Sequence, residues 1–217
     1  MPPPAAILFD LDGTLVDSRA DLAASINHMR REYGFPPLDV ATVTTFVGNG
    51  MRRLIERAIE DTGIPLQDAI QSSRTYYFDH LLDATTLYPG VKDALEVLQS
   101  RGIALALVTN KPVTPAQAIL AGLGVRELFG AVVGGDSCST LKPHPAPLNK
   151  AVQELGFDPA ADADRIWMAG DNYTDLEAAA NAGFRSCLCR YGFGNPRDLA
   201  PNRTINAAAD LVALADN

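Results

Sequence analysis

Short apolar runs alternate with helix-like stretches along most of this 217-residue chain, and this alternation is the feature that most restricts its fold. The runs are almost continuously apolar, which is typical of strands in a parallel sheet that helices cover on both faces. Regular strand–helix alternation favours a doubly wound α/β sheet, a Rossmann-like core. We expect its buried strands at residues 5–9, 103–108, 131–133, 166–169 and 186–189.

Helical periodicity fills the gaps between these runs. The expected helices lie at residues 91–100, 114–120, 145–155 and 174–181, and a weak strand (204–207) and a short helix follow near the C-terminus. A glycine in the left-handed conformation often ends a helix. We expect such ends at Gly102, Gly122, Gly156 and Gly183.

One stretch, residues 16–86, interrupts the alternation because it has no good strand run. Apolar residues recur there at helical spacing in three stripes, which predict a small bundle of helices inserted after the first strand. The expected organisation is a catalytic core of residues 1–15 and 87–217 and a helical cap of residues 16–86. The sequence Gly48-Asn49-Gly50 within the cap is unsuited to a helix interior and predicts a loop, either a plain connection or one that faces a substrate.

Composition excludes several classes of partner. The chain has 18 Lys and Arg against 26 Asp and Glu, a net charge of −8, so we expect no nucleic-acid partner. No apolar run approaches the roughly 20 residues of a membrane span, and the first residues do not resemble a signal peptide, so we expect no membrane association. Three cysteines without a metal-ligand pattern indicate reduced thiols in a cytoplasmic protein: Cys138, Cys187 and Cys189.

The strongest chemical signal is the sequence Phe9-Asp10-Leu11-Asp12-Gly13-Thr14, in which two carboxylates follow the first strand. Open α/β sheets bind ligands at the carboxyl ends of their strands, so Asp10 is expected at a ligand site. Gly13 permits a sharp turn and a close approach of backbone N–H groups to an anion. Taken alone, the motif is also compatible with an acidic surface turn.

Three further motifs make that alternative weaker. Thr109-Asn110 ends a core strand, Lys142 lies beside prolines, and Asp171 and Asp175 follow a later strand. Each has a structural explanation when taken singly, as a helix cap, a solvated lysine or acids at a helix start. Together, clustered carboxylates predict a Mg²⁺ site, and the lysine and hydroxyl could bind phosphate oxygens. A remaining carboxylate could attack phosphorus while another transfers a proton, which indicates phosphoryl transfer.

The order of these motifs resembles the haloacid dehalogenase superfamily over nearly the whole chain, and residues 9–18, 47–52, 88–91 and 142–148 resemble its phosphoglycolate phosphatase branch. The resemblance implies that Asp10 is the nucleophile and Asp12 the general acid and base. It also implies that Lys142, Thr109 and Asn110 hold the transferring phosphoryl group. Mg²⁺ would be bound by Asp10, the main-chain carbonyl of Asp12 and Asp171. Asp175 would contact these ligands without binding the ion itself.

The chain departs from this resemblance at Asn172, where many relatives have serine, so the ligand shell nearby is expected to differ slightly. The segment Gly192-Phe193-Gly194 also resembles a late segment of the branch, but the resemblance assigns it no role.

The expected activity is Mg²⁺-dependent hydrolysis of small phosphate monoesters through an aspartyl phosphate, with 2-phosphoglycolate as the first candidate. Gly48, Asn49, Gly50 and Arg52 of the cap are the candidate leaving-group contacts, with Arg52 proposed to bind a substrate carboxylate. The alternatives are a sugar-phosphate phosphatase, a phosphoglucomutase-like phosphoryl transferase and a non-catalytic phosphate-binding regulatory module. A monomer and a homodimer are both compatible with the sequence.

Overall fold

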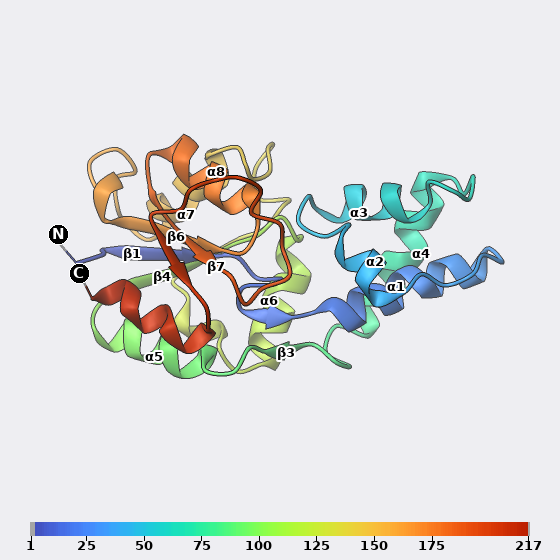
Figure 1. Ribbon diagram of the computed structural model, residues 1–217, viewed down its shortest axis with the longest axis horizontal. Coiled ribbons are helices and arrows are strands. Elements are labelled where there is room, and N and C mark those ends of the chain that lie inside the picture. The colour runs from blue at the N-terminus through green and yellow to red at the C-terminus, as the bar shows by residue number, and fades with distance from the viewer. Residues whose placement is uncertain (1–2, 217) are drawn as a thin grey trace.

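Six parallel strands form one sheet in the computed structural model, which describes residues 3–216 (Figure 1). Their order across the sheet is β5-β4-β1-β6-β7-β8, so the first strand lies near the middle. This arrangement confirms the predicted doubly wound α/β core. The strands are β1 (Ala6–Phe9), β4 (Ala104–Val108), β5 (Ala131–Val133), β6 (Ile166–Gly170), β7 (Arg185–Cys189) and β8 (Arg203–Ile205).

Helices cover both faces of the sheet because alternate strand residues point to opposite sides. On β1, Ile7 and Phe9 belong to one buried apolar cluster, whereas Ala6 and Leu8 belong to another. The first cluster packs against α5 (Val91–Ser100), α6 (Val113–Gly122) and the 3-10 helix η3 (Ala208–Ala215). The second packs against α7 (Ala146–Glu154) and α8 (Tyr173–Ala182). The remaining single turns are η1 (Arg126–Leu128) and η2 (Ala163–Arg165).

The predicted end of α6 is wrong. Gly122 was expected to end this helix in a left-handed conformation, but it is the last residue of the helix itself. The left-handed glycine is Gly124, with a φ of 69°. Leu120 and Ile119 are both fully buried, and with the left-handed glycine two residues later, the backbone N–H of Val125 reaches the carbonyl of Leu120. Gly102, Gly156 and Gly183 do have the expected positive φ.

A separate helical unit lies beyond the carboxyl ends of the strands (Figure 1). It consists of α1 (Arg19–Glu32), α2 (Val40–Thr44), α3 (Met51–Ala58) and α4 (Leu66–Asp79). The unit has its own apolar cluster, which includes Ile26, Met29, Ile55 and Tyr77. The short helix α2 was not expected from the sequence. It begins at an Asp39 cap whose side chain accepts a hydrogen bond from the backbone of Thr42.

Two strands of two residues each connect this unit to the sheet. β2 (Val16–Asp17) pairs antiparallel with β3 (Thr86–Leu87), in a stretch where no strand was predicted. Strands of two residues are too short to show periodicity, so the sequence pattern did not predict them. Asp21 of α1 strengthens this connection, since its carboxylate accepts hydrogen bonds from the backbone N–H groups of Ala84 and Thr85.

Among residues 3–216, no helix has the length and apolar content needed to cross a membrane. The three cysteines are present as free thiols, and Cys187 and Cys189 are buried.

Candidate active site

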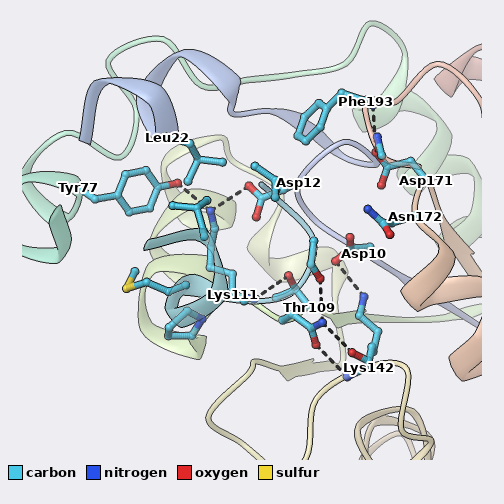
Figure 2. Close-up of a pocket in the computed structure, with 18 of the residues that line it drawn as sticks. Asp10, Asp12, Leu22, Tyr77, Thr109, Lys111, Lys142, Asp171, Asn172 and Phe193 are labelled. Atoms are coloured by element: carbon cyan, nitrogen blue, oxygen red, sulfur yellow. Dashed lines mark hydrogen bonds and ion pairs between the residues drawn. The ribbon is translucent and has the colours of Figure 1, made fainter. Parts of the chain in front are cut away.

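The pocket between the sheet and the helical unit collects side chains from the ends of three neighbouring strands (Figure 2). Asp10 follows β1, Thr109 follows β4 and Asp171 follows β6. Because these strands are parallel neighbours, their carboxyl ends meet at one edge. The loop carrying Lys142 reaches the same place, so the structure brings together the core residues that the sequence motifs singled out.

Lys142 is buried between two carboxylates. Its Nζ lies 3.0 Å from Asp10 Oδ1 and 2.7 Å from Asp175 Oδ1, and it donates a third hydrogen bond to the carbonyl of Val108 at 2.6 Å. Burial lowers the pKa of this ammonium, but the carboxylates of Asp10 and Asp175 outweigh burial and raise the pKa above its ordinary value. All three N–H groups of Lys142 are therefore occupied, and its charge fixes the orientation of Asp10.

Asn110 lines the pocket, but its side chain is hydrogen-bonded to the backbone of neighbouring loops. Its side-chain oxygen accepts a bond from the backbone N–H of Lys142 at 2.9 Å, and its Nδ2 donates to the carbonyls of Lys142 and Gly48, both at 3.0 Å. These bonds occupy the amide, which was predicted to bind phosphate. The hydroxyl of Thr109 is different, because it accepts a bond from the backbone N–H of Lys111 and keeps its own proton to donate.

Asp10, Asp171 and Asp175 form a compact carboxylate cluster. One oxygen from each lies within 4.8 Å of the others, and all three residues are buried. Burial, together with the charges of Asp10 and Asp175, raises the pKa of Asp171 well above its ordinary value. Burial also raises the pKa of Asp175 to about 6, against the opposing effect of Lys142.

Three buried carboxylates this close together disfavour one another's charged forms, and hard oxygen ligands of this kind suit a divalent cation. The residues therefore fit such an ion. Within the cluster, Asp175 is held at both oxygens, since Oδ1 accepts a bond from Lys142 and Oδ2 accepts the backbone N–H of Asn172 in the capping box of α8.

The segment Gly192-Phe193-Gly194, whose role the sequence left open, holds Asp171 in place. The backbone N–H groups of Phe193 and Gly194 donate to Asp171 Oδ2 at 3.0 and 2.7 Å. A side chain at position 192 does not fit, because its Cβ would lie 2.2 Å from the carbonyl oxygen of Gly13. The position of this segment shortly after β7 was the available signal, since it lies at the same edge of the sheet.

Lys111 is a pocket residue that the sequence analysis did not select. Its Nζ donates to Asp12 Oδ1 at 2.9 Å and to the hydroxyl of Tyr77 at 2.7 Å (Figure 2). Burial lowers the pKa of Lys111, but the Asp12 carboxylate and Tyr77 outweigh it, so the pKa is raised. The hydroxyl of Ser18 also donates to Asp12 Oδ1, at 2.5 Å. Asp12 is thus held through a single oxygen, which leaves Oδ2 to face the pocket.

The loop at residues 48–50 contacts the core directly. A Cβ on Gly48 would lie 2.6 Å from Nδ2 of Asn172, so this close approach requires glycine. Asn49 donates from Nδ2 to the hydroxyl of Tyr173 at 2.7 Å, outside the lining of the pocket. Gly48 and Gly50 do line the pocket, together with Val47, Met51 and Leu54.

Arg52 does not line this pocket. Its side chain is 68% exposed, and its Nε is 2.9 Å from Glu56 Oε1. Position 52 lies in the first turn of α3, and the same helix buries Leu54 and Ile55 instead. The expected contact between Arg52 and a substrate in this pocket therefore has no geometric support.

Comparison with known proteins places these features in a family. The model of the haloacid dehalogenase-like hydrolases matches residues 7–189. Among curated proteins, the chain is 38% identical over 218 residues to the phosphoglycolate phosphatase of Chromobacterium violaceum, covering 98% of this chain and 96% of that protein. It is 39% identical over 218 residues to the phosphoglycolate phosphatase of Haemophilus influenzae strain Rd, covering 95% of this chain and 96% of the relative.

Solved structures also resemble this chain. A crystal structure described as a predicted phosphoglycolate phosphatase from Haemophilus somnus superposes with a TM-score of 0.90 at 34% identity, covering 99% of both chains. The structure of CbbY from Rhodobacter sphaeroides in complex with phosphate has a TM-score of 0.80 at 24% identity and supports the fold alone.

Proposed function

This chain belongs to the haloacid dehalogenase-like hydrolase family, and we propose that it is a Mg²⁺-dependent phosphatase that hydrolyses 2-phosphoglycolate to glycolate and phosphate. The observation that carries the proposal is the pairing of Asp10 with Lys142 beside the carboxylate cluster. A nucleophilic carboxylate needs a fixed orientation and a nearby positive charge to meet a phosphate dianion, and this edge of the sheet provides both.

Asp10 is the nucleophile in this proposal. One of its carboxylate oxygens attacks phosphorus, the bond between phosphorus and the leaving oxygen breaks, and an aspartyl phosphate forms. Asp12 donates a proton from its carboxyl group to the leaving oxygen, so glycolate departs as an alcohol rather than an alkoxide. The bonds from Lys111 and Ser18 to Asp12 Oδ1 orient Oδ2 for this transfer.

Hydrolysis of the intermediate reverses the roles. A water molecule attacks phosphorus, Asp12 accepts its proton, and the bond from phosphorus to Asp10 breaks to release phosphate. The hydroxyl of Thr109 donates a hydrogen bond to a phosphoryl oxygen during both steps, and Lys142 balances the negative charge of Asp10, which disappears when the aspartyl phosphate forms and returns when it is hydrolysed.

Mg²⁺ is the proposed cation, held by Asp10, Asp171 and the main-chain carbonyl of Asp12, with Asp175 orienting the site through Lys142 and Asn172. When bound, this ion neutralises phosphoryl oxygens and orients the phosphate for in-line attack. The paired backbone donors of Phe193 and Gly194 keep Asp171 in one orientation for that role.

We further propose that residues 16–86 form a cap domain on a core of residues 1–15 and 87–217. The separate apolar cluster of α1–α4 and the short β2–β3 connection support this division. Closure of the cap excludes water that would otherwise compete at the phosphorylated aspartate. We also propose that the protein is cytoplasmic.

The experiment is a comparison of kcat/KM over a panel of phosphate monoesters with and without Mg²⁺. The panel contains 2-phosphoglycolate, glucose 1-phosphate, glucose 6-phosphate and 4-nitrophenyl phosphate. The proposal expects 2-phosphoglycolate to have the highest kcat/KM among the natural esters and chelation of the metal to abolish turnover. Preference for a hexose phosphate would contradict the proposed substrate, and interconversion of the two glucose phosphates would indicate phosphoryl transfer instead.

A further inference from the structure

The pocket contains few positive charges to bind an anionic leaving group. Among its lining residues within the described part of the chain, only Lys111 and Lys142 are cationic. The segment 16–86 contains no lysine. None of its seven arginines lines the pocket; Arg30, for example, is buried against Asp61, and Arg52 and Arg53 pair with Glu56 on the outside of α3. A carboxylate that pairs with a cation in this pocket therefore pairs with one of the two lysines.

The two lysines differ in what they still have to offer. The three N–H groups of Lys142 are engaged by Asp10, Asp175 and the carbonyl of Val108. Lys111 donates two hydrogen bonds, to Asp12 and to Tyr77. An ammonium group has three donors, so Lys111 keeps one for a ligand.

The position of Lys111 also suits a leaving group rather than the phosphoryl group. Figure 2 shows its ammonium on the side of the pocket near Leu22 and Tyr77, whereas Lys142 lies beside Asp10. The helical unit contributes the apolar residues Leu22, Met51 and Leu54 to the lining of this pocket. In such surroundings an ion pair is little screened by water, and a single cation has a large effect on which ligand binds.

We propose that Lys111 binds the carboxylate of the substrate and is the residue that selects 2-phosphoglycolate over neutral phosphate monoesters; this inference rests on the proposed function. The Tyr77 hydroxyl, 2.7 Å from Lys111 Nζ, holds the ammonium in place. Because Tyr77 belongs to α4 and Lys111 follows β4, the complete contact exists only when the cap is closed on the core.

The test compares two esters of equal chain length, 2-phosphoglycolate and the neutral 2-hydroxyethyl phosphate, at saturating Mg²⁺. The measured quantity is the ratio of their kcat/KM values. Lys111→Met removes the charge with little change in volume and also deprives Asp12 of a partner, so both rates fall. The ratio separates the two effects, and we expect it to fall at least about tenfold, as for the loss of a hydrogen bond to a charged group.

Two variants serve as controls. Lys111→Arg keeps a cation and should retain more of the preference than Lys111→Met. Arg52→Ala removes the cation that the sequence indicated and should keep the ratio within about twofold of wild type. Circular dichroism and thermal melting establish whether each variant is folded.

A further measurement uses the wild-type protein alone, so it does not depend on the folding of any variant. It compares 2-phosphoglycolate, 2-hydroxyethyl phosphate and 2-aminoethyl phosphate, and we expect kcat/KM to fall in that order, from the anionic through the neutral to the cationic leaving group. A wild-type protein without this order refutes the proposed substrate and this inference together. A wild-type preference that survives in Lys111→Met, or disappears in Arg52→Ala, refutes the inference on Lys111 and leaves the proposed function standing.

Discussion

Gly192→Ala is a sharp test of the metal site because it perturbs Asp171 without changing any carboxylate. A Cβ at position 192 would lie 2.2 Å from the carbonyl oxygen of Gly13 and 2.5 Å from Asp171 Oδ2. Neither distance is tolerable, so the segment must move away from Asp171. Movement lengthens the bonds that Phe193 and Gly194 donate to Asp171, now 3.0 and 2.7 Å.

The magnitude follows from those two bonds. A hydrogen bond to a charged group contributes about 1.5–3 kcal/mol, so the loss of one weakens cation binding by about ten- to a hundredfold. Overpacking adds roughly 1–3 kcal/mol of destabilisation, which lowers Tm by about 2–4 °C for each kcal/mol in a chain of this size. We therefore expect a modestly less stable protein that needs much more Mg²⁺ for half-maximal activity.

The assay is a Mg²⁺ titration of 4-nitrophenyl phosphate hydrolysis, combined with thermal melting. Gly102→Ala is the matched control, because Gly102 has a φ of 76° with nothing within 4 Å of the added Cβ. This variant should lose stability through backbone strain of about 1–2 kcal/mol and keep the wild-type Mg²⁺ dependence. Wild-type Mg²⁺ dependence in Gly192→Ala would refute the idea that residues 192–194 position Asp171 for a cation.

Three further predictions concern the carboxylates. Asp10→Asn should lower kcat by ~10⁴-fold or more in steady-state assays while the circular dichroism spectrum stays native, and near-normal turnover would exclude covalent catalysis. Asp12→Asn should slow hydrolysis of an alkyl phosphate more than that of 4-nitrophenyl phosphate, whose leaving group hardly needs a proton; equal losses would count against an acid role. The third prediction concerns how stability depends on pH. The pKa of Asp171 is raised and that of Asp175 is raised to about 6, so without metal the native protein binds more protons than the unfolded chain at roughly pH 4–6. The contribution of these two carboxyl groups to the free energy of unfolding therefore falls as pH rises. Because Mg²⁺ must displace these protons, the increase in Tm that Mg²⁺ causes should be larger at pH 7.5 than at pH 4.5. An equal increase at both pH values would argue against Mg²⁺ binding at this cluster.

The core could be predicted because its signals are local. β5 and α5 occupy the residues that the apolar runs and helical periodicity indicated, and β1 and β4 each begin one residue later than expected. Parallel strands bring their carboxyl ends to one edge, so the positions of Asp10, Thr109 and Asp171 at strand ends already implied a common pocket. For these three residues, a position just after a strand in the sequence is enough to predict a position at the pocket.

The cap side of the pocket could not be predicted in this way. Lys111 follows Thr109-Asn110 in the sequence, but its importance depends on Asp12, 99 positions away, and on Tyr77, 34 positions away. Arg52 was the more conspicuous cation because it follows the glycine-rich loop. The orientation of α3 decides that Arg52 faces solvent, and orientation depends on the packing of Leu54 and Ile55 against the other cap helices.

The contacts that close the cap are consistent with a lid that opens in each catalytic cycle. Asn110 reaches the carbonyl of Gly48, Asn49 reaches Tyr173, and Lys111 reaches Tyr77. At a net ~0.5–1.5 kcal/mol for each of the two neutral hydrogen bonds and ~1.5–3 kcal/mol for the one from the Lys111 ammonium, these three contribute about 2.5–6 kcal/mol, an amount that thermal opening overcomes on the timescale of turnover. A substrate that bridges Asp10 in the core and Lys111 beneath Tyr77 would add to this closing energy. Departure of the leaving group would remove that contribution and favour opening for release.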